Sequence, residues 1–236
     1  PGEIGSKVLH FEKCFHGRSG YTLSLTDSPD PRKVKYFPKF DWPRVSTPNI
    51  NFPLDEKSLE DVIRRENISI EQIKDAIQKN PHDIACIIIE PIQGQTLGLL
   101  PNNYLKEVVR FCKKNNILVL IDEIKVGMGR TGKLFSFSHE NVIPDIVTIS
   151  KALGGGKRAI GAMVTSAKLS KLAYGKRKDS ALHSTTFSGL GTSCAVAIEA
   201  LNIISENYFL DDVQAKGDYL LQELQKLKTK YPKAIV

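Results

Sequence analysis

The chain has 236 residues, of which 41% are hydrophobic and 25% are charged, with a formal net charge of +7. This composition is ordinary for a globular protein of one large or two small domains. No apolar run is long enough to span a membrane, and the N-terminal residues lack the plan of a signal peptide. The basic residues are scattered, which favours solvated helix faces over a nucleic-acid site. We therefore expect a cytoplasmic protein with neither a membrane nor nucleic acid as a partner.

The cysteines do not have the spacing of a zinc site. Cys14, Cys86, Cys112 and Cys194 are too far apart in the sequence to form a C-x-x-C pair. Cys86 and Cys112 lie within apolar patterns and are predicted to be buried thiols, as in a reducing compartment. We expect no metal ion.

Short apolar segments alternate with helical patterns in the middle of the chain. Segments 84–89, 117–121 and 146–149 are rich in β-branched residues, and 160–165 is a candidate for a fourth strand. Continuous apolar strands are typical of a parallel sheet that is covered on both faces. We therefore predict an α/β fold, a mostly parallel sheet flanked by helices.

The helical segments are predicted from the spacing of apolar residues. Between the first two strands, apolar residues recur every three or four positions in a helix that begins near Pro101, which completes a βαβ unit. Further helices are expected over 58–80, with a break near residues 67–69, over 193–206 and over 210–230. Residues 26–53 are rich in proline and aromatic residues and are predicted to be irregular.

Two strand ends offer side chains that can carry chemistry. Strand 117–121 leads into Asp122, and strand 146–149 leads to Lys151, which precedes a glycine-rich turn at 154–156. Ligands of open α/β sheets bind beyond the carboxyl ends of the strands. A lysine buried there loses its proton more easily and can form a Schiff base. The alternative is an exposed loop lysine and a helix-capping aspartate, and spacing alone does not decide between the two.

A glycine motif in the middle of the chain is similar to the dinucleotide-binding fingerprint. Residues 127–132 match G-x-G-x-x-G, but the motif does not directly follow its strand and no apolar-faced helix follows it. The context therefore argues against dinucleotide binding.

Several motifs in order resemble the class III aminotransferases, a pyridoxal-phosphate (PLP) family of fold type I. They are FHGRSG at 15–20, EPIQG at 90–94, DEI at 122–124, GRTG at 129–132, PDI at 144–146, KALGGG at 151–156 and STTF at 184–187. Residues 15–26, 37–44 and 81–86 resemble lysine 6-aminotransferases and, less closely, 4-aminobutyrate aminotransferases. The resemblance implies the large PLP-binding domain of such an enzyme.

The resemblance also assigns the central cofactor contacts. Lys151 is expected to hold PLP as a Schiff base and, once freed, to move the substrate proton. Asp122 is expected to keep the pyridine nitrogen protonated, which makes the ring an electron sink. Phe15 and Ile124 are expected to cover the two ring faces, and the alternative for both is simple core packing. His16, Glu90 and Lys125 complete this cofactor-binding set.

Other residues are assigned to the phosphate and the substrate. Thr186, with Thr185 as its neighbour in the motif, is expected to bind the cofactor phosphate across the interface of a homodimer. Arg18 is expected to hold a substrate carboxylate, with a surface arginine as the alternative. Lys125 stands where the family usually has glutamine, and Gln95 where many members have glutamate. A cation at Lys125 would favour the phenolate of the cofactor, and Gln95 argues against lysine or ornithine as the substrate.

The expected reaction is transfer of an amino group from an amine or ω-amino acid to a 2-oxo acid. The phosphate-binding loop and the C-terminal small domain of the family are not in this sequence, so we expect a fragment. Residues 1–206 are predicted to be the central part of the large domain, and 207–236 a helix leading towards the small domain. A non-catalytic remnant and a PLP aminomutase or racemase remain alternatives.

Overall fold

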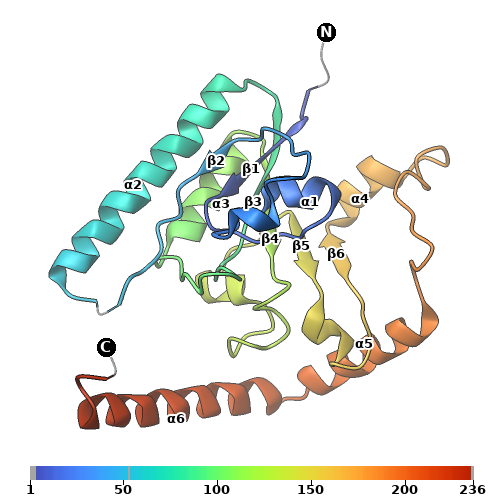
Figure 1. Ribbon diagram of the computed structural model, residues 1–236. Coiled ribbons are helices and arrows are strands. Elements are labelled where there is room, and N and C mark those ends of the chain that lie inside the picture. The colour runs from blue at the N-terminus through green and yellow to red at the C-terminus, as the bar shows by residue number, and fades with distance from the viewer. Residues whose placement is uncertain (1–3, 53, 235–236) are drawn as a thin grey trace.

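A six-stranded sheet forms the centre of the molecule, which we describe from a computed structural model for residues 4–52 and 54–234 (Figure 1). The strand order is β2-β1-β3-β4-β5-β6. Every pairing from β2 to β5 is parallel, and β6 runs antiparallel to β5. The prediction of a mostly parallel sheet is confirmed. The strands are β1 (Lys7–Phe11), β2 (Arg44–Val45), β3 (Ile84–Ile89), β4 (Leu118–Asp122), β5 (Ile146–Ile149) and β6 (Ala162–Thr165).

The register of the central strands brings their carboxyl ends to one edge. Ile89, the last residue of β3, pairs with Ile121 of β4. Asp122, the last residue of β4, pairs with Thr148 of β5. Because the strands are parallel, the residues that follow each of them emerge side by side.

Helices cover the sheet around two hydrophobic cores. The larger core joins β1, β3 and β4 to α2 and α3, and includes Ile73, Ile87 and Val108. The smaller core joins β5 to η3 and α5, and includes Val147 and Leu153. The helices are α1 (Gly20–Leu25), α2 (Glu56–Lys79), α3 (Tyr104–Lys114), α4 (Ala167–Tyr174), α5 (Gly191–Ile204) and α6 (Phe209–Lys230), with 3₁₀ turns η1 (Pro31–Lys33), η2 (Ser136–Glu140) and η3 (Lys151–Gly154).

The predicted break near residues 67–69 is wrong, because α2 is continuous. The Asp55 side chain accepts a hydrogen bond from the Ser58 N–H at 2.7 Å and caps the first turn. Ser69 is buried, and its hydroxyl donates to the Ser46 carbonyl at 2.7 Å and lies 2.6 Å from the Tyr104 hydroxyl. Serine disfavours helices when it competes for nearby backbone groups. Here tertiary partners satisfy it, so the helix runs through.

The C-terminal third is more exposed than its apolar pattern suggests. Strand β6 is largely exposed, and Ile198 of α5 is 60% exposed. The buried residues of α5 are Ser193, Ala197, Ala200 and Ile204. Helix α6 has no buried residue and runs along one end of the molecule, away from the sheet (Figure 1).

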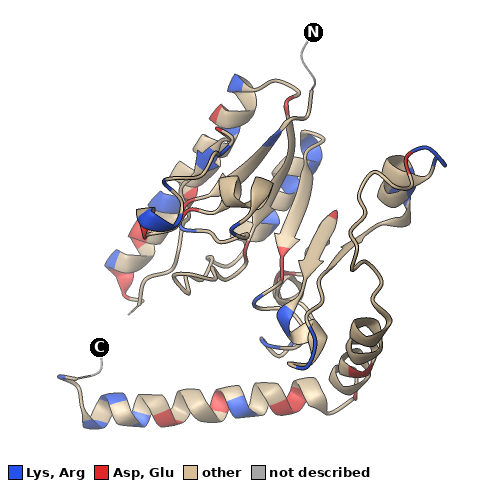
Figure 2. Cartoon of the chain, turned by 45° about the vertical axis from the view of Figure 1, so that its right-hand side comes forward, with Lys and Arg blue, Asp and Glu red and all other residues tan. Residues whose placement is uncertain are grey.

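The charges of the long helices are interspersed. Lys and Arg alternate with Asp and Glu along α2 and α6 (Figure 2). Ion pairs with helical spacing, such as Lys79 with Asp75 and Lys216 with Asp212, account for part of this pattern. Within the described residues, no helix combines the length and the apolar character that a membrane span requires.

Candidate active site

Four neighbouring strand ends build one pocket. Phe15 and His16 follow β1, Glu90 follows β3, Asp122 ends β4, and Lys151 follows β5. The pocket has a volume of about 370 Å³. It is lined by Phe15, His16, Gly17, Lys33, Glu90, Gly94, Gln95, Asp122, Ile124, Lys125 and Lys151. The structure therefore brings together eight residues singled out in the sequence.

Asp122 and His16 form a buried pair at this pocket. His16 Nδ1 lies 2.8 Å from Asp122 Oδ2, and the two side chains are only 1% and 6% exposed. The other carboxylate oxygen accepts a hydrogen bond from the Ile124 N–H at 3.0 Å. A carboxylate offers about four acceptor positions, so two bonds leave room for a further donor from the pocket.

The pair changes the titration of the imidazole. Burial alone would lower the pKa of His16, but the hydrogen bond to Asp122 and the nearby Cys14 thiol outweigh it and raise the pKa to about 10. The hydrogen bond from the imidazole holds the Asp122 carboxylate in place at the end of β4. Nε2 of His16 is buried without a hydrogen-bond partner among the described residues.

Glu90 fixes the backbone on two sides of the pocket. Its Oε2 accepts a hydrogen bond from the Phe15 N–H at 2.9 Å, and its Oε1 accepts one from the Gly94 N–H at 2.7 Å. Burial raises the pKa of Glu90, while the positive charge of His16 and these two backbone bonds oppose that shift. The carboxylate thus positions Phe15 and the 94–95 turn relative to each other.

The two departures from the family pattern, Lys125 and Gln95, both bond to the backbone. Lys125 Nζ donates to the Gly94 carbonyl at 2.8 Å. Gln95 Nε2 donates to the Cys14 carbonyl at 2.9 Å and to the Asp27 carbonyl at 3.2 Å. The Gln95 amide therefore links Cys14, in the loop after β1, to Asp27, at the start of the segment that was predicted to be irregular.

Lys151 lies at the pocket but is not buried. It is exposed and adopts a left-handed conformation with φ of 45° at the start of η3. The expectation that Lys151 is buried is therefore wrong for this chain, because the sheet end leaves the side chain open. The fold does place Lys151 and Asp122 at one site, since both residues line the same cavity.

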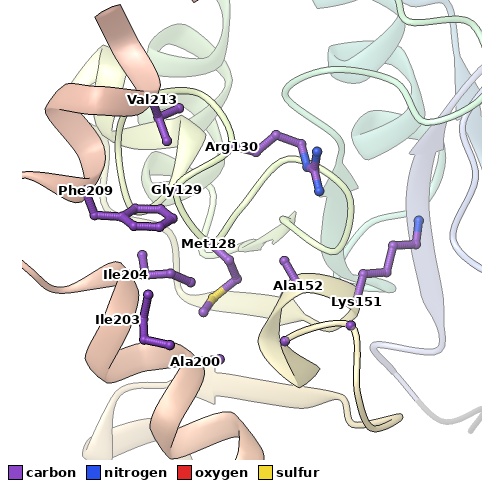
Figure 3. Close-up of a pocket in the computed structure, with 12 residues that line it drawn as sticks. Met128, Gly129, Arg130, Lys151, Ala152, Ala200, Ile203, Ile204, Phe209 and Val213 are labelled. Atoms are coloured by element: carbon purple, nitrogen blue, oxygen red, sulfur yellow. The ribbon is translucent and has the colours of Figure 1, made fainter. Parts of the chain in front are cut away.

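A second, larger pocket lies on another side of Lys151. It has a volume of about 820 Å³ between η3, α5 and α6. Figure 3 shows Ile203, Ile204, Phe209 and Val213 gathered on one side, with the charged ends of Arg130 and Lys151 pointing away from them. This pocket is mainly apolar and offers no acid beside the lysine.

Three predicted site residues lie outside the 370 Å³ pocket. Arg18 and Thr186 are exposed and do not line it. Thr185 lines an adjoining pocket of about 920 Å³ that also includes Lys151. Lys33 is a lining residue that the sequence did not indicate, because it lies in a segment predicted to be irregular and no motif contains it.

The G-x-G-x-x-G motif at residues 127–132 lies in a loop with a structural role. Glu123 is 1% exposed and accepts hydrogen bonds from the Ser136 hydroxyl at 2.5 Å, the Ser136 N–H at 3.1 Å and the Phe137 N–H at 3.0 Å. These bonds close the loop that contains residues 127–132, and η2, not an α-helix, follows it. The described residues contain no group of three or more His, Cys, Asp or Glu side chains that could hold a metal ion.

The family model for class-III aminotransferases matches residues 3–236. The chain belongs to this family. Class-III aminotransferases depend on PLP, so the resemblance of the ordered motifs is confirmed at the level of the family.

Individual class-III relatives agree with this placement. An acetylornithine aminotransferase of Methanocaldococcus jannaschii is 36% identical over 240 residues, which cover 98% of this chain and 51% of the relative. Among solved structures, a lysine aminotransferase of M. tuberculosis superposes with a TM-score of 0.77 at 29% identity, covering 97% of this chain and 51% of that one. An (S)-enantioselective omega-transaminase of Thermomicrobium roseum has a TM-score of 0.81 at 29% identity, covering 94% and 49%. The class-III chain described here thus spans about half the length of these relatives.

Proposed function

We propose that this chain carries the cofactor-binding core of a PLP-dependent aminotransferase. The reaction is transfer of an amino group from an amine or ω-amino acid donor to a 2-oxo acid acceptor. The observation that carries the proposal is that Asp122 and Lys151, from adjacent strand ends, line one pocket. Family membership supports the same chemistry.

The residues of the pocket fit a pyridine ring. A volume of about 370 Å³ lies within the range of small-molecule sites. Asp122 has acceptor capacity left for a ring N–H, and His16 holds its carboxylate in place. Phe15 and Ile124 supply apolar surface for the ring faces.

Bound PLP supplies a reactive aldehyde and an electron-accepting ring. Lys151 would hold the cofactor through Nζ and, when free, would take and return the substrate proton as a general base. Asp122, held by His16, would retain the proton on the ring nitrogen. Glu90 would keep Phe15 against the ring through the backbone hydrogen bond described above.

The remaining roles complete the proposed site. Lys125 would lie near the phenolic oxygen of the cofactor, where a cation favours the phenolate. Thr186, with Thr185 beside it, would bind the phosphate of the neighbouring subunit in a homodimer. The exposure of both threonines in the single chain is compatible with such a role. Arg18 would contact the substrate carboxylate, and Gln95 would border the substrate.

We also propose a cytoplasmic enzyme whose helix α6 leads towards a small C-terminal domain. The four cysteines are free, and burial raises the pKa of Cys86 to about 11 and that of Cys112 to about 12, which keeps both as thiols. Unpaired thiols fit a reducing compartment.

Borohydride reduction in the presence of PLP tests the lysine. The purified protein should gain one covalent pyridoxyl group, and peptide mapping should place it on Lys151. Lys151→Ala should abolish the label, while Lys157→Ala, in the same exposed turn but outside the pocket, should retain it. A label that survives in Lys151→Ala contradicts the proposal. Labelling without amino transfer to any 2-oxo acid would instead favour the non-catalytic alternative.

A further inference from the structure

Three lysines line the proposed cofactor pocket, and only two of them have a proposed role or a hydrogen-bond partner there. Lys151 would hold the cofactor, and Lys125 donates to the Gly94 carbonyl at 2.8 Å. The third is Lys33, at the end of η1. Its ammonium forms no hydrogen bond or close ion pair within residues 4–52 and 54–234. Asp30 beside it pairs with Arg32 at 2.9 Å, and the charge of Lys33 acts on Asp30 only at longer range.

The turn that carries Lys33 is locally ordered. Pro31 begins η1, and the Asp30 side chain accepts a hydrogen bond from the Arg32 N–H at 3.1 Å. The Lys33 N–H then donates to the Asp30 carbonyl at 3.1 Å. Proline at the first position and an aspartate cap both favour such a turn.

Gln95 anchors the start of the chain segment that leads to Lys33. Its amide donates to the Asp27 carbonyl at 3.2 Å and to the Cys14 carbonyl at 2.9 Å. Arg44 and the Lys13 N–H bind the Asp27 carboxylate at 3.1 and 2.7 Å. Asp27 is therefore held by four hydrogen bonds, counting the one from its own N–H to the Cys14 carbonyl at 3.0 Å, and Lys33 follows six residues later.

We propose that Lys33, in place of Arg18, binds a carboxylate of the substrate at a distance from the reacting amine. This inference rests on the proposed function and names the substrate class within it, an ω-amino acid in preference to an uncharged amine. Gln95 is then a positioning residue for the Lys33 segment, because both of its amide hydrogens are committed to carbonyls.

The charges of the pocket support an anionic substrate. Asp122 is paired with His16, and Glu90 accepts two backbone N–H bonds, so both acids have partners within the protein. Lys33 remains available, while Arg18, the expected carboxylate partner, does not line this cavity. An ammonium with three donors and a flexible stem suits a carboxylate that approaches from solvent.

Binding of pentanoate and of pentanamide, its neutral isostere, tests the proposal without turnover. Both are measured by calorimetry on the purified protein, with and without PLP. The wild-type protein should bind pentanoate at least about tenfold more tightly, and added salt should reduce the difference because the ammonium is exposed. Lys33→Ala should remove the preference, and Lys33→Arg should retain it. Lys35→Ala, two residues away and outside the pocket, should behave as the wild type.

Three results would overturn the assignment of Lys33. They are a wild-type protein with no preference for pentanoate, a preference that persists in Lys33→Ala, and an equal loss in Lys35→Ala. If Arg18→Ala removes the preference and Lys33→Ala does not, the carboxylate binds to Arg18. None of these results depends on labelling of Lys151, so failure of the cofactor assignment is recognised separately by the borohydride experiment.

Discussion

His16 Nδ1 lies 2.8 Å from Asp122 Oδ2, and both side chains are almost completely buried. The pKa of His16 is raised to about 10, well above the ordinary value of 6.5, because the bond to the carboxylate outweighs burial. A raised folded-state pKa contributes stability that is fully present below pH 6.5 and is lost as the pH rises through about 10.

We therefore expect the free energy of unfolding to fall between pH 6.5 and 10, by an amount on the order of a few kcal/mol. Urea unfolding across this range measures it. His16→Gln should be less stable at pH 6.5 and should lose this part of the decline, whereas exposed His139→Gln should retain it. An identical decline in His16→Gln would show that another group causes it.

Gly94→Ala should disturb the link between Glu90 and Phe15. A Cβ at residue 94 would lie 2.9 Å from Glu90 Oε1, closer than real contacts allow. The carboxylate has to shift and loses part of its two backbone bonds, so we expect about 1–3 kcal/mol of destabilisation. Thermal unfolding measures it, with Gly191→Ala as control, since nothing lies within 4 Å of a Cβ there. Equal effects of the two substitutions would contradict the Glu90 contact.

Gln95→Glu restores the residue that many family members carry, yet it should destabilise this protein. A carboxylate cannot donate, so the Cys14 and Asp27 carbonyls each lose a hydrogen bond. The expected cost is about 1–3 kcal/mol, with faster proteolytic cleavage between residues 27 and 52. Gln225→Glu, on α6, is a matched control. Unchanged cleavage in Gln95→Glu would mean that Gln95 does not hold the segment.

Gly217→Ala should stabilise the protein by about 0.5–1 kcal/mol, because a glycine within a helix loses more backbone entropy than alanine. Gly217 lies in α6 with nothing within 4 Å of an added Cβ. Gly132→Ala should do the opposite, because Gly132 has φ of +80° and its Cβ would meet Gln214 Oε1 at 2.6 Å. Urea unfolding of the two variants checks both signs, and a loss of stability in Gly217→Ala would contradict the account.

The sequence predicted the parts of the fold that rest on local patterns. The apolar strands β3, β4 and β5 and the amphipathic helix α3 lie where their spacing placed them, because continuous apolar runs and helical periodicity reflect burial directly. Strand β1 was missed. Its sequence, KVLHF, contains a lysine and a histidine, and His10 is 1% exposed only because neighbouring elements cover it.

The direction of a strand is a different kind of property. β6 was predicted as a strand of a mostly parallel sheet, and it pairs antiparallel to β5. Side-chain alternation is the same in both directions, so periodicity does not distinguish them. Likewise, the apolar patterns of β6 and α6 predicted a strand and a helix but not which elements pack against them. In this chain both elements are largely exposed.

The sequence by itself determined that an acid and a lysine stand at the ends of two buried strands, because strand patterns and strand ends are local. Only the tertiary structure decided that these ends adjoin, that His16 lies against Asp122 from 106 residues away, and that Lys33 lines the same pocket. Contacts between distant segments depend on strand order and loop paths. These follow from packing of the whole chain and leave no periodic signal in the residues that make them.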